Sequence, residues 1–200
     1  MNDFFKNGSN NIEYQELIDD KDQNGNMSQI IATDVVGSIS GAGDIDIASG
    51  VTLTAGGLAN ASTTFSGVVS GDGAFSKAGS GTTTLSGVNT LSGATTINGG
   101  TLAVSGSLAD TTVVDVASGA TYQVAASDTI GGLQGAGGVD LAGNLLSVNI
   151  VDAGVSTTFS GVISGTNSGS SLTKSGSGTL KLSGANTYQG ATTIEAGVLE

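Results

Sequence analysis

One stretch of this chain occurs twice almost unchanged: TTFSGVVSG begins at Thr63 and TTFSGVISG begins at Thr157. The similarity extends well beyond these nine residues. At an offset of 94 residues it covers residues 37–71 without a gap, and after three inserted residues it covers 76–97 at an offset of 97. The chain after Val36 therefore consists of two copies of a unit of about 94 to 97 residues, and internal repetition of this kind is typical of a solenoid.

Between the repeated glycines, apolar and polar residues alternate in short runs such as TTTLSG, TLAVSG and TTVVDVASG. These runs are too short for helices, and Val, Thr and Ile favour extended structure. One face of each strand can be buried, and the glycines permit bends with positive φ. A single unit cannot bury its apolar face alone, whereas stacked units bury a continuous column. We therefore predict an all-β chain without a helix after Val36, folded as a parallel β-solenoid.

A β-sandwich and an up-and-down β-barrel are the alternatives. Both usually have longer strands, more aromatic residues and turns every 8–12 residues, whereas turn signals recur here about every six to eight residues. In the solenoid we expect Gly67 and Gly161 to form the bends after the repeated phenylalanines. Equivalent core depths are predicted for three pairs of repeated residues: Phe65 and Phe159, Leu85 and Leu182, and Ile97 and Ile194.

The composition excludes several classes of function. The chain has no Cys, His, Pro, Trp or Arg, so thiol chemistry, Ser-His pairs and ordinary zinc or haem sites are ruled out. A net charge of −12 argues against nucleic acid and against anionic membrane surfaces. The sequence contains neither a signal peptide nor an apolar run of about 20 residues, so we expect no membrane insertion by this stretch.

Residues 1–35 differ from the rest and are predicted to form an acidic N-terminal segment, poorly ordered or capping, beside a solenoid over 36–200. Within this segment, DKDQNGNMS resembles the first nine positions of an EF-hand calcium loop. The twelfth position, normally a bidentate Glu, is Ile31, so the loop is incomplete and an acidic turn is the alternative. The candidate calcium ligands are Asp20, Asp22, Asn24, Asn26 and Ser28.

Two further sets of polar residues are candidates for a site. Asp44 and Asp46 lie two apart on one strand, and Asp140 repeats Asp46. Catalysis by paired carboxylates needs a cleft and a raised pKa, and solvated strand carboxylates fit this Gly-Ala-rich segment better. Asn89 and Asn186 occupy equivalent turns, where Asn tolerates the left-handed conformation and can bond to neighbouring turns, so we expect a structural role.

The second copy, TTFSGVISGTNSGSSLTKSGSGTLKLSGANTYQGATTI, resembles the autotransporter-associated β-strand repeat, also called the passenger-associated transport repeat. It keeps the Phe-Ser-Gly start, the Leu-x-Lys-x-Gly-x-Gly-x-Leu-x-Leu centre and the Ser-Gly-x-Asn-x-Tyr-x-Gly-x-Thr-x-Ile end of that repeat. The first copy keeps the three parts of the repeat with departures, having Phe75 for Leu172, Thr83 for Leu180 and Leu91 for Tyr188.

The resemblance implies a right-handed parallel β-helix from the passenger of a Gram-negative surface protein. In that family a signal peptide precedes the passenger and an outer-membrane β-barrel follows it, so we expect this chain to be a fragment that reaches the cell surface through the periplasm and outer membrane. The implied role is a non-enzymatic stalk that assists export and vectorial folding, with no cofactor other than calcium at the incomplete loop. Adhesion to a host or bacterial partner through a lateral face is the main alternative, and a polysaccharide-degrading enzyme is the third.

Overall fold

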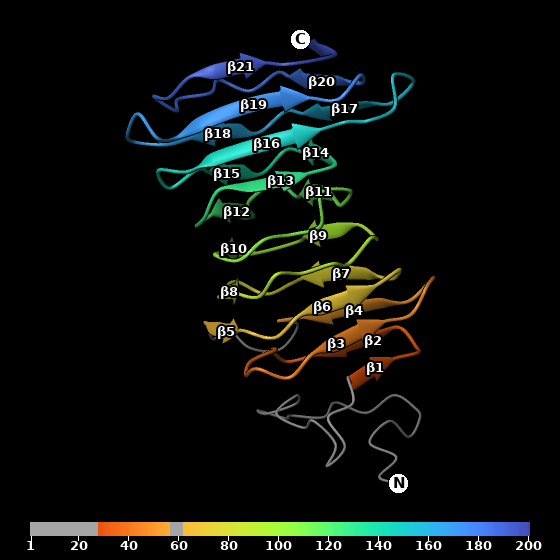
Figure 1. Ribbon diagram of the computed structural model, residues 1–200. Helices are drawn as coiled ribbons and strands as arrows, with labels where there is room; N and C mark the ends of the chain where they lie inside the picture. Colours follow the sequence, from red (N-terminus) through yellow and green to blue (C-terminus); the bar gives the residue numbers. More distant parts are fainter. Residues whose placement is uncertain (1–27, 57–61) are drawn as a thin grey trace, which may run out of the picture.

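The computed structural model describes residues 28–56 and 62–200, and these residues form twenty-two β-strands and no helix. Every strand pair in this part of the chain is parallel, and the strands stack as a β-solenoid of about eight turns. One turn takes from 17 residues, where Ser28 pairs with Ile45, to 26, where Leu145 pairs with Ser171. The predicted fold class is confirmed (Figure 1).

Three sides surround the core, and each is a stack of strands contributed by successive turns (Figure 1). The first side is a nine-stranded sheet of β2 (Asp34–Val36), β4 (Thr52–Ala55), β7 (Ala74–Lys77), β9 (Thr95–Ile97), β11 (Val113–Val116), β14 (Gly132–Gly135), β17 (Ser156–Phe159), β20 (Thr179–Leu182) and β22 (Val198–Leu199). The second side is a six-stranded sheet of β5 (Thr63–Phe65), β8 (Thr82–Leu85), β10 (Thr101–Val104), β12 (Thr121–Val124), β15 (Gly138–Asp140) and β18 (Val162–Ser164).

The third side has strands only at its two ends. Its N-terminal part is the sheet of β1 (Ser28–Ile30), β3 (Ile45–Ile47) and β6 (Val69–Gly71), and its C-terminal part is the sheet of β13 (Asp128–Ile130), β16 (Leu145–Asn149), β19 (Ser171–Ser175) and β21 (Thr192–Ile194). Between β6 and β13 two irregular segments cover the core. Backbone bonds from Thr90 N to Val69 O and from Asn89 N to Ser107 O, both 2.9 Å, tie these segments to neighbouring turns.

Figure 1 also shows the sense of the coil. On the near side, β16 and β19 run from left to right, and the chain returns behind them through β17 and β18. Each turn lies closer to the C-terminal end than the turn before it. The coil is therefore right-handed, which is the usual sense of parallel crossover connections.

Alternation along each strand builds the core. In β11, Val114 and Val116 point inward and are buried, while Val113 and Asp115 are partly exposed. Because successive turns are in register, the inward residues stack into continuous apolar columns. The largest buried apolar side chains are Tyr122, Phe65, Phe75 and Phe159.

The predicted core pairs are confirmed in part. Phe65, Phe159, Leu85 and Ile97 are buried, and Leu182 is partly buried against the core. Ile194, the counterpart of Ile97, is 55% exposed. It lies on β21, the last strand of its sheet, and no described turn stacks on the outer edge of that strand.

The two copies of the repeat do not lie on the same sides of the solenoid. Phe65 is on the six-stranded sheet and Phe159 is on the nine-stranded sheet. Lys77 is on the nine-stranded sheet, whereas Lys174 is on the four-stranded part of the third side. The second copy is therefore displaced by one side from a whole number of turns, so the paired residues do not lie in the same column.

At the N-terminal end, β1 pairs with β3 and β2 pairs with β4. Strands of the solenoid therefore lie before Val36. Residues 1–27, which make up most of the predicted acidic segment, are outside the described residues. None of the described segments is a helix with the length and hydrophobicity needed to cross a bilayer.

Candidate functional site

The glycine of TTFSGV lies where two turns approach most closely. A Cβ atom on Gly67 would lie 2.0 Å from the carbonyl oxygen of Gly43, and one on Gly161 would lie 1.6 Å from that of Gly137, each one turn earlier. Neither glycine has a positive φ. Both follow their phenylalanines at a corner, as predicted, but the requirement for glycine comes from stacked backbones rather than from a left-handed bend.

A buried lysine closes a different corner in each copy. Lys77 is 1% exposed, and its Nζ donates to the carbonyl oxygens of Ala78 at 2.5 Å, Gly79 at 3.1 Å and Gly99 at 3.2 Å. Ala78 and Gly79 form the corner after β7, whereas Gly99 belongs to the corner one turn later. One ammonium group therefore ties two successive turns together, and burial lowers its pKa.

Lys174 repeats this arrangement at an offset of 97 residues. Its side chain is fully buried, and Nζ donates to the carbonyl oxygens of Ser175, Gly176 at 2.8 Å and Ala196 at 3.4 Å. Burial lowers the pKa of this amine too. The corners are alike because Gly79 and Gly176 both adopt positive φ, 68° and 69°, which non-glycine residues rarely do. The Lys-x-Gly spacing of the repeat thus specifies both the lysine and the corner carbonyls that accept from its ammonium group. We call this lysine with its carbonyl acceptors the lysine cage.

Asn89 and Asn186 have the structural role that was predicted for them. The Asn89 Oδ1 accepts from Val69 N at 2.9 Å, and its Nδ2 donates to Gly87 O at 3.0 Å and Ser107 O at 2.9 Å, so this buried amide spans three turns. The Asn186 Oδ1 accepts from Ile163 N at 2.9 Å. Neither Asn has a positive φ, so the expected left-handed conformation is not the reason for Asn here.

The three candidate carboxylates make structural bonds to neighbouring turns. Asp46 and Asp140 lie on β3 and β15, whereas Asp44 lies just before β3 and not on the same strand as predicted. Asp44 accepts from Val68 N at 2.8 Å, and Asp46 accepts from the side chain of Gln29 at 3.3 Å. Asp140 accepts from Gln123 at 3.1 Å in the equivalent pairing. In each pair, Gln and Asp are register partners on neighbouring parallel strands. A second carboxylate in place of the Gln would repel the Asp, and the neutral amide avoids this repulsion.

The predicted calcium loop falls almost entirely outside the described residues. Asp20, Asp22, Asn24 and Asn26 lie there, and only the backbone of Ser28, at the start of β1, is described. In residues 28–56 and 62–200 no group of three or more Asp or Glu residues could hold a metal ion. The calcium loop therefore stays a prediction.

Sequence reasoning missed one buried carboxyl group. Asp128 is 6% exposed and accepts from the Tyr122 hydroxyl at 3.0 Å, from Thr129 N at 3.0 Å and from Leu108 N at 3.2 Å. Two features of the sequence could have indicated it. The alternation of TYQV places Tyr122 inward, and Asp128 follows six residues after Tyr122. These features indicate proximity but do not reveal that Asp128 turns into the core.

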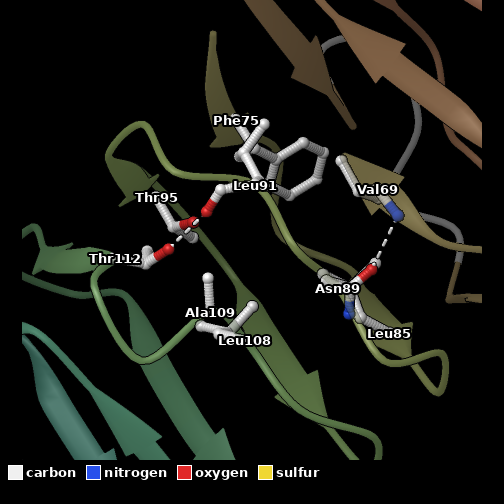
Figure 2. Close-up of a pocket in the computed structure, with 9 residues that line it drawn as sticks. All are labelled: Val69, Phe75, Leu85, Asn89, Leu91, Thr95, Leu108, Ala109 and Thr112. Carbon is white, nitrogen blue, oxygen red and sulfur yellow. Dashed lines mark hydrogen bonds between the residues drawn. The ribbon is translucent and has the colours of Figure 1, made fainter. Parts of the chain in front are cut away.

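A small, mostly apolar cavity lies beneath the irregular part of the third side (Figure 2). Phe75, Leu85 and Leu91 line it, and the Thr112 hydroxyl donates to Leu91 O at 2.6 Å at its edge. In the second copy the position of Leu91 is Tyr188, which packs against the core. The lining is mostly apolar, and its polar side chains are Asn89, Thr95 and Thr112.

The family model described as passenger-associated-transport-repeat matches residues 75–104 and residues 172–200. The chain carries this repeat twice. Each passenger-associated-transport-repeat begins on the strand of a buried lysine, and each contains that lysine, its carbonyl cage and the bridging Asn.

The repeat implies an autotransporter passenger-type β-helical domain, and the family is a structural passenger repeat rather than an enzymatic family. Comparison with curated proteins and with solved structures gave no match.

Proposed function

We propose that this chain is a stalk segment of an autotransporter passenger and that its repeats assist export and stepwise folding at the bacterial cell surface. The observation that carries the proposal is the lysine cage in each repeat. Because Nζ bonds to carbonyls of its own corner and of the next turn, the cage is complete only after the next turn has stacked.

The chemistry of the chain supports the same role. An exported chain that crosses the periplasm unfolded gains from having no cysteine, and this sequence has none. In the unfolded chain both lysines are solvated charges, and they become buried only on stacking. The partners in this proposal are a signal peptide and an outer-membrane translocator elsewhere in the same polypeptide.

The test places the 200-residue chain as the passenger between a signal peptide and an autotransporter translocator. We expect Lys77→Met combined with Lys174→Met to reduce the amount of folded, protease-resistant passenger on the cell surface at least several-fold. Leaving buried carbonyls without a donor costs about 1–3 kcal/mol each. Lys181→Met is the control, since Lys181 is exposed and forms only a surface ion pair with Glu200 at 3.9 Å. Unchanged display of the double variant would contradict the proposed role.

Adhesion is the second candidate, and a specific surface favours it. Outward-facing threonines line the six-stranded sheet: Thr82, Thr101 and Thr121 are in register, and Thr64 is opposite Thr84. Such a flat hydroxyl-rich face suits a polar host or bacterial surface. Adhesion of cells that display the chain to immobilised matrix, lost on Thr84→Glu with Thr101→Glu while display persists, would support this candidate.

A further inference from the structure

Where the third side lacks strands, side chains replace part of the backbone ladder. Asn89 bridges the turns on either side of it through its amide, as described above. Two turns after Asn89, Asp128 takes a similar position: Leu108 N, one turn before Asp128, donates to both carboxyl oxygens at 3.2 Å. The Asp128 carboxyl group therefore accepts from the turn before it, as the Asn89 Oδ1 does two turns earlier.

The surroundings of Asp128 supply donors but no cation among the described residues. Its contacts are Leu108 N from the irregular segment, the Tyr122 hydroxyl from β12 and Thr129 N from β13. The residue paired with it on β16 is the apolar Leu146. The titratable groups that face it are Tyr122 and Asp110. The lysines of the described residues are engaged elsewhere, two in their cages and Lys181 beside Glu200.

We propose that Asp128 is a proton-controlled clamp between two turns of the solenoid, which holds the irregular third side most firmly when its carboxyl group is protonated. Ionisation puts an unpaired negative charge into the core. That charge weakens the attachment of the segment around Leu108 to the turn that carries β13.

The electrostatics agree with this geometry. Burial and the nearby Asp110 raise the pKa of Asp128, the three hydrogen bonds offset only part of the increase, and the net pKa moves from 3.8 to about 6. The pKa of the Tyr122 hydroxyl is also raised well above its usual value by burial and by Asp128, so Tyr122 stays a neutral donor across this range.

The sign of the pH effect follows from linkage. A folded-state pKa above the unfolded value means that the stabilisation is present at low pH and is lost as the pH rises through about 6. Across the whole range from below the unfolded pKa to above the folded pKa, the shift changes the unfolding equilibrium constant roughly 100-fold. Between about pH 5 and pH 7.5 the change is about tenfold.

Urea unfolding of the full chain across this pH range tests the clamp. Between about pH 5 and pH 7.5 we expect the unfolding constant of the wild type to rise about tenfold more than that of Asp128→Asn. Asp115→Asn is the matched control, because Asp115 is only partly buried and accepts from Gln134 at 2.8 Å on the outer face. That variant should keep the pH response of the wild type.

A direct titration makes the test independent of variant folding. In the folded wild type, the carbon-13 signal of the Asp128 carboxyl group should titrate near pH 6, the pKa given above. Amide exchange at Leu108, corrected for intrinsic rates, should slow on acidification. A carboxyl that titrates near its ordinary pKa, or identical pH profiles for the wild type and Asp128→Asn, would overturn the proposal.

Discussion

Two repeated threonines have hydroxyl groups that are buried without a hydrogen-bond partner in the described part of the chain. They are Thr63 and Thr157, the first residue of each TTFSGV. Thr157 is 6% exposed, and its methyl group lies toward Gly132 on the neighbouring strand. A buried hydroxyl without a partner costs free energy that a methyl group of the same shape does not.

Thr157→Val should therefore raise the free energy of unfolding by about 1 kcal/mol. The substitution keeps the β-branched shape and removes only the unsatisfied oxygen. Urea unfolding at a fixed pH measures the change. Thr158→Val, on the exposed face of the same strand, is the control and should change stability by much less. A loss of stability in Thr157→Val would mean that its hydroxyl has a partner in solution, such as water.

At this scale the sequence predicted which residues point inward but not what the polar ones do there. The alternation around Phe65 and Phe159 was enough to place both in the core. The pairing of Lys77 with Lys174 was also visible, yet their burial depends on carbonyls from two turns that lie about 20 residues apart. No local pattern contains that information, and the same holds for Asp128.

Among the elements, the corners are more demanding than the strands. Strands of three to five residues tolerate Val, Thr, Leu or Ile inward, but at some corners the backbones of successive turns almost touch. Gly161 faces the carbonyl of Gly137, and a Cβ atom on Gly184 would lie 1.7 Å from the carbonyl oxygen of Gly161. At these corners only glycine leaves room for the backbone of the neighbouring turn.

Gly161→Ala should destabilise the fold by about 3 kcal/mol or more, because its Cβ would meet a backbone oxygen that cannot move without shifting a whole turn. Gly138→Ala is the matched control: the nearest atom to its Cβ would be the Thr121 hydroxyl oxygen, at 3.7 Å. Thermal and urea unfolding distinguish the two. Equal effects of both substitutions would show that close stacking at Gly161 is not what requires glycine.

Short strands and the absence of helices from the described residues followed from sequence, whereas the interruption of the third side did not. The segment around Asn89 has the same turn chemistry as the corners that flank true strands. Such a segment forms a strand only if its backbone N–H and C=O groups can pair with those of the turns above and below. In this case side-chain bonds from Asn89 and Asp128 satisfy several of those groups instead.

For the whole molecule, stacking makes each turn a near-independent layer that contacts only its neighbours. Thr82, Thr101 and Thr121 begin consecutive layers of the six-stranded sheet in register. The solenoid form and the repeat length could be predicted from the internal similarity. The displacement of the second copy by one side could not, because it depends on turn lengths that vary between 17 and 26 residues.

Deleting residues 101–120 removes one turn in register, since Thr121 then follows Gly100 in place of Thr101. We expect the shortened chain to fold with native-like β circular dichroism and a lower urea m value, in proportion to the surface lost. Deletion of residues 101–110 removes about half a turn and puts the sides out of phase, so that chain should not fold. Loss of folding in the in-register deletion would show that the turns are not interchangeable layers.

The sideways displacement of the second copy has a mechanical consequence. Its lysine cage lies on a different side of the shaft from the first cage. If the cages lay along one line, the rod would be reinforced along a single edge and would bend most easily away from it. Because the two cages lie on different sides, they spread the resistance to bending around the axis of the solenoid.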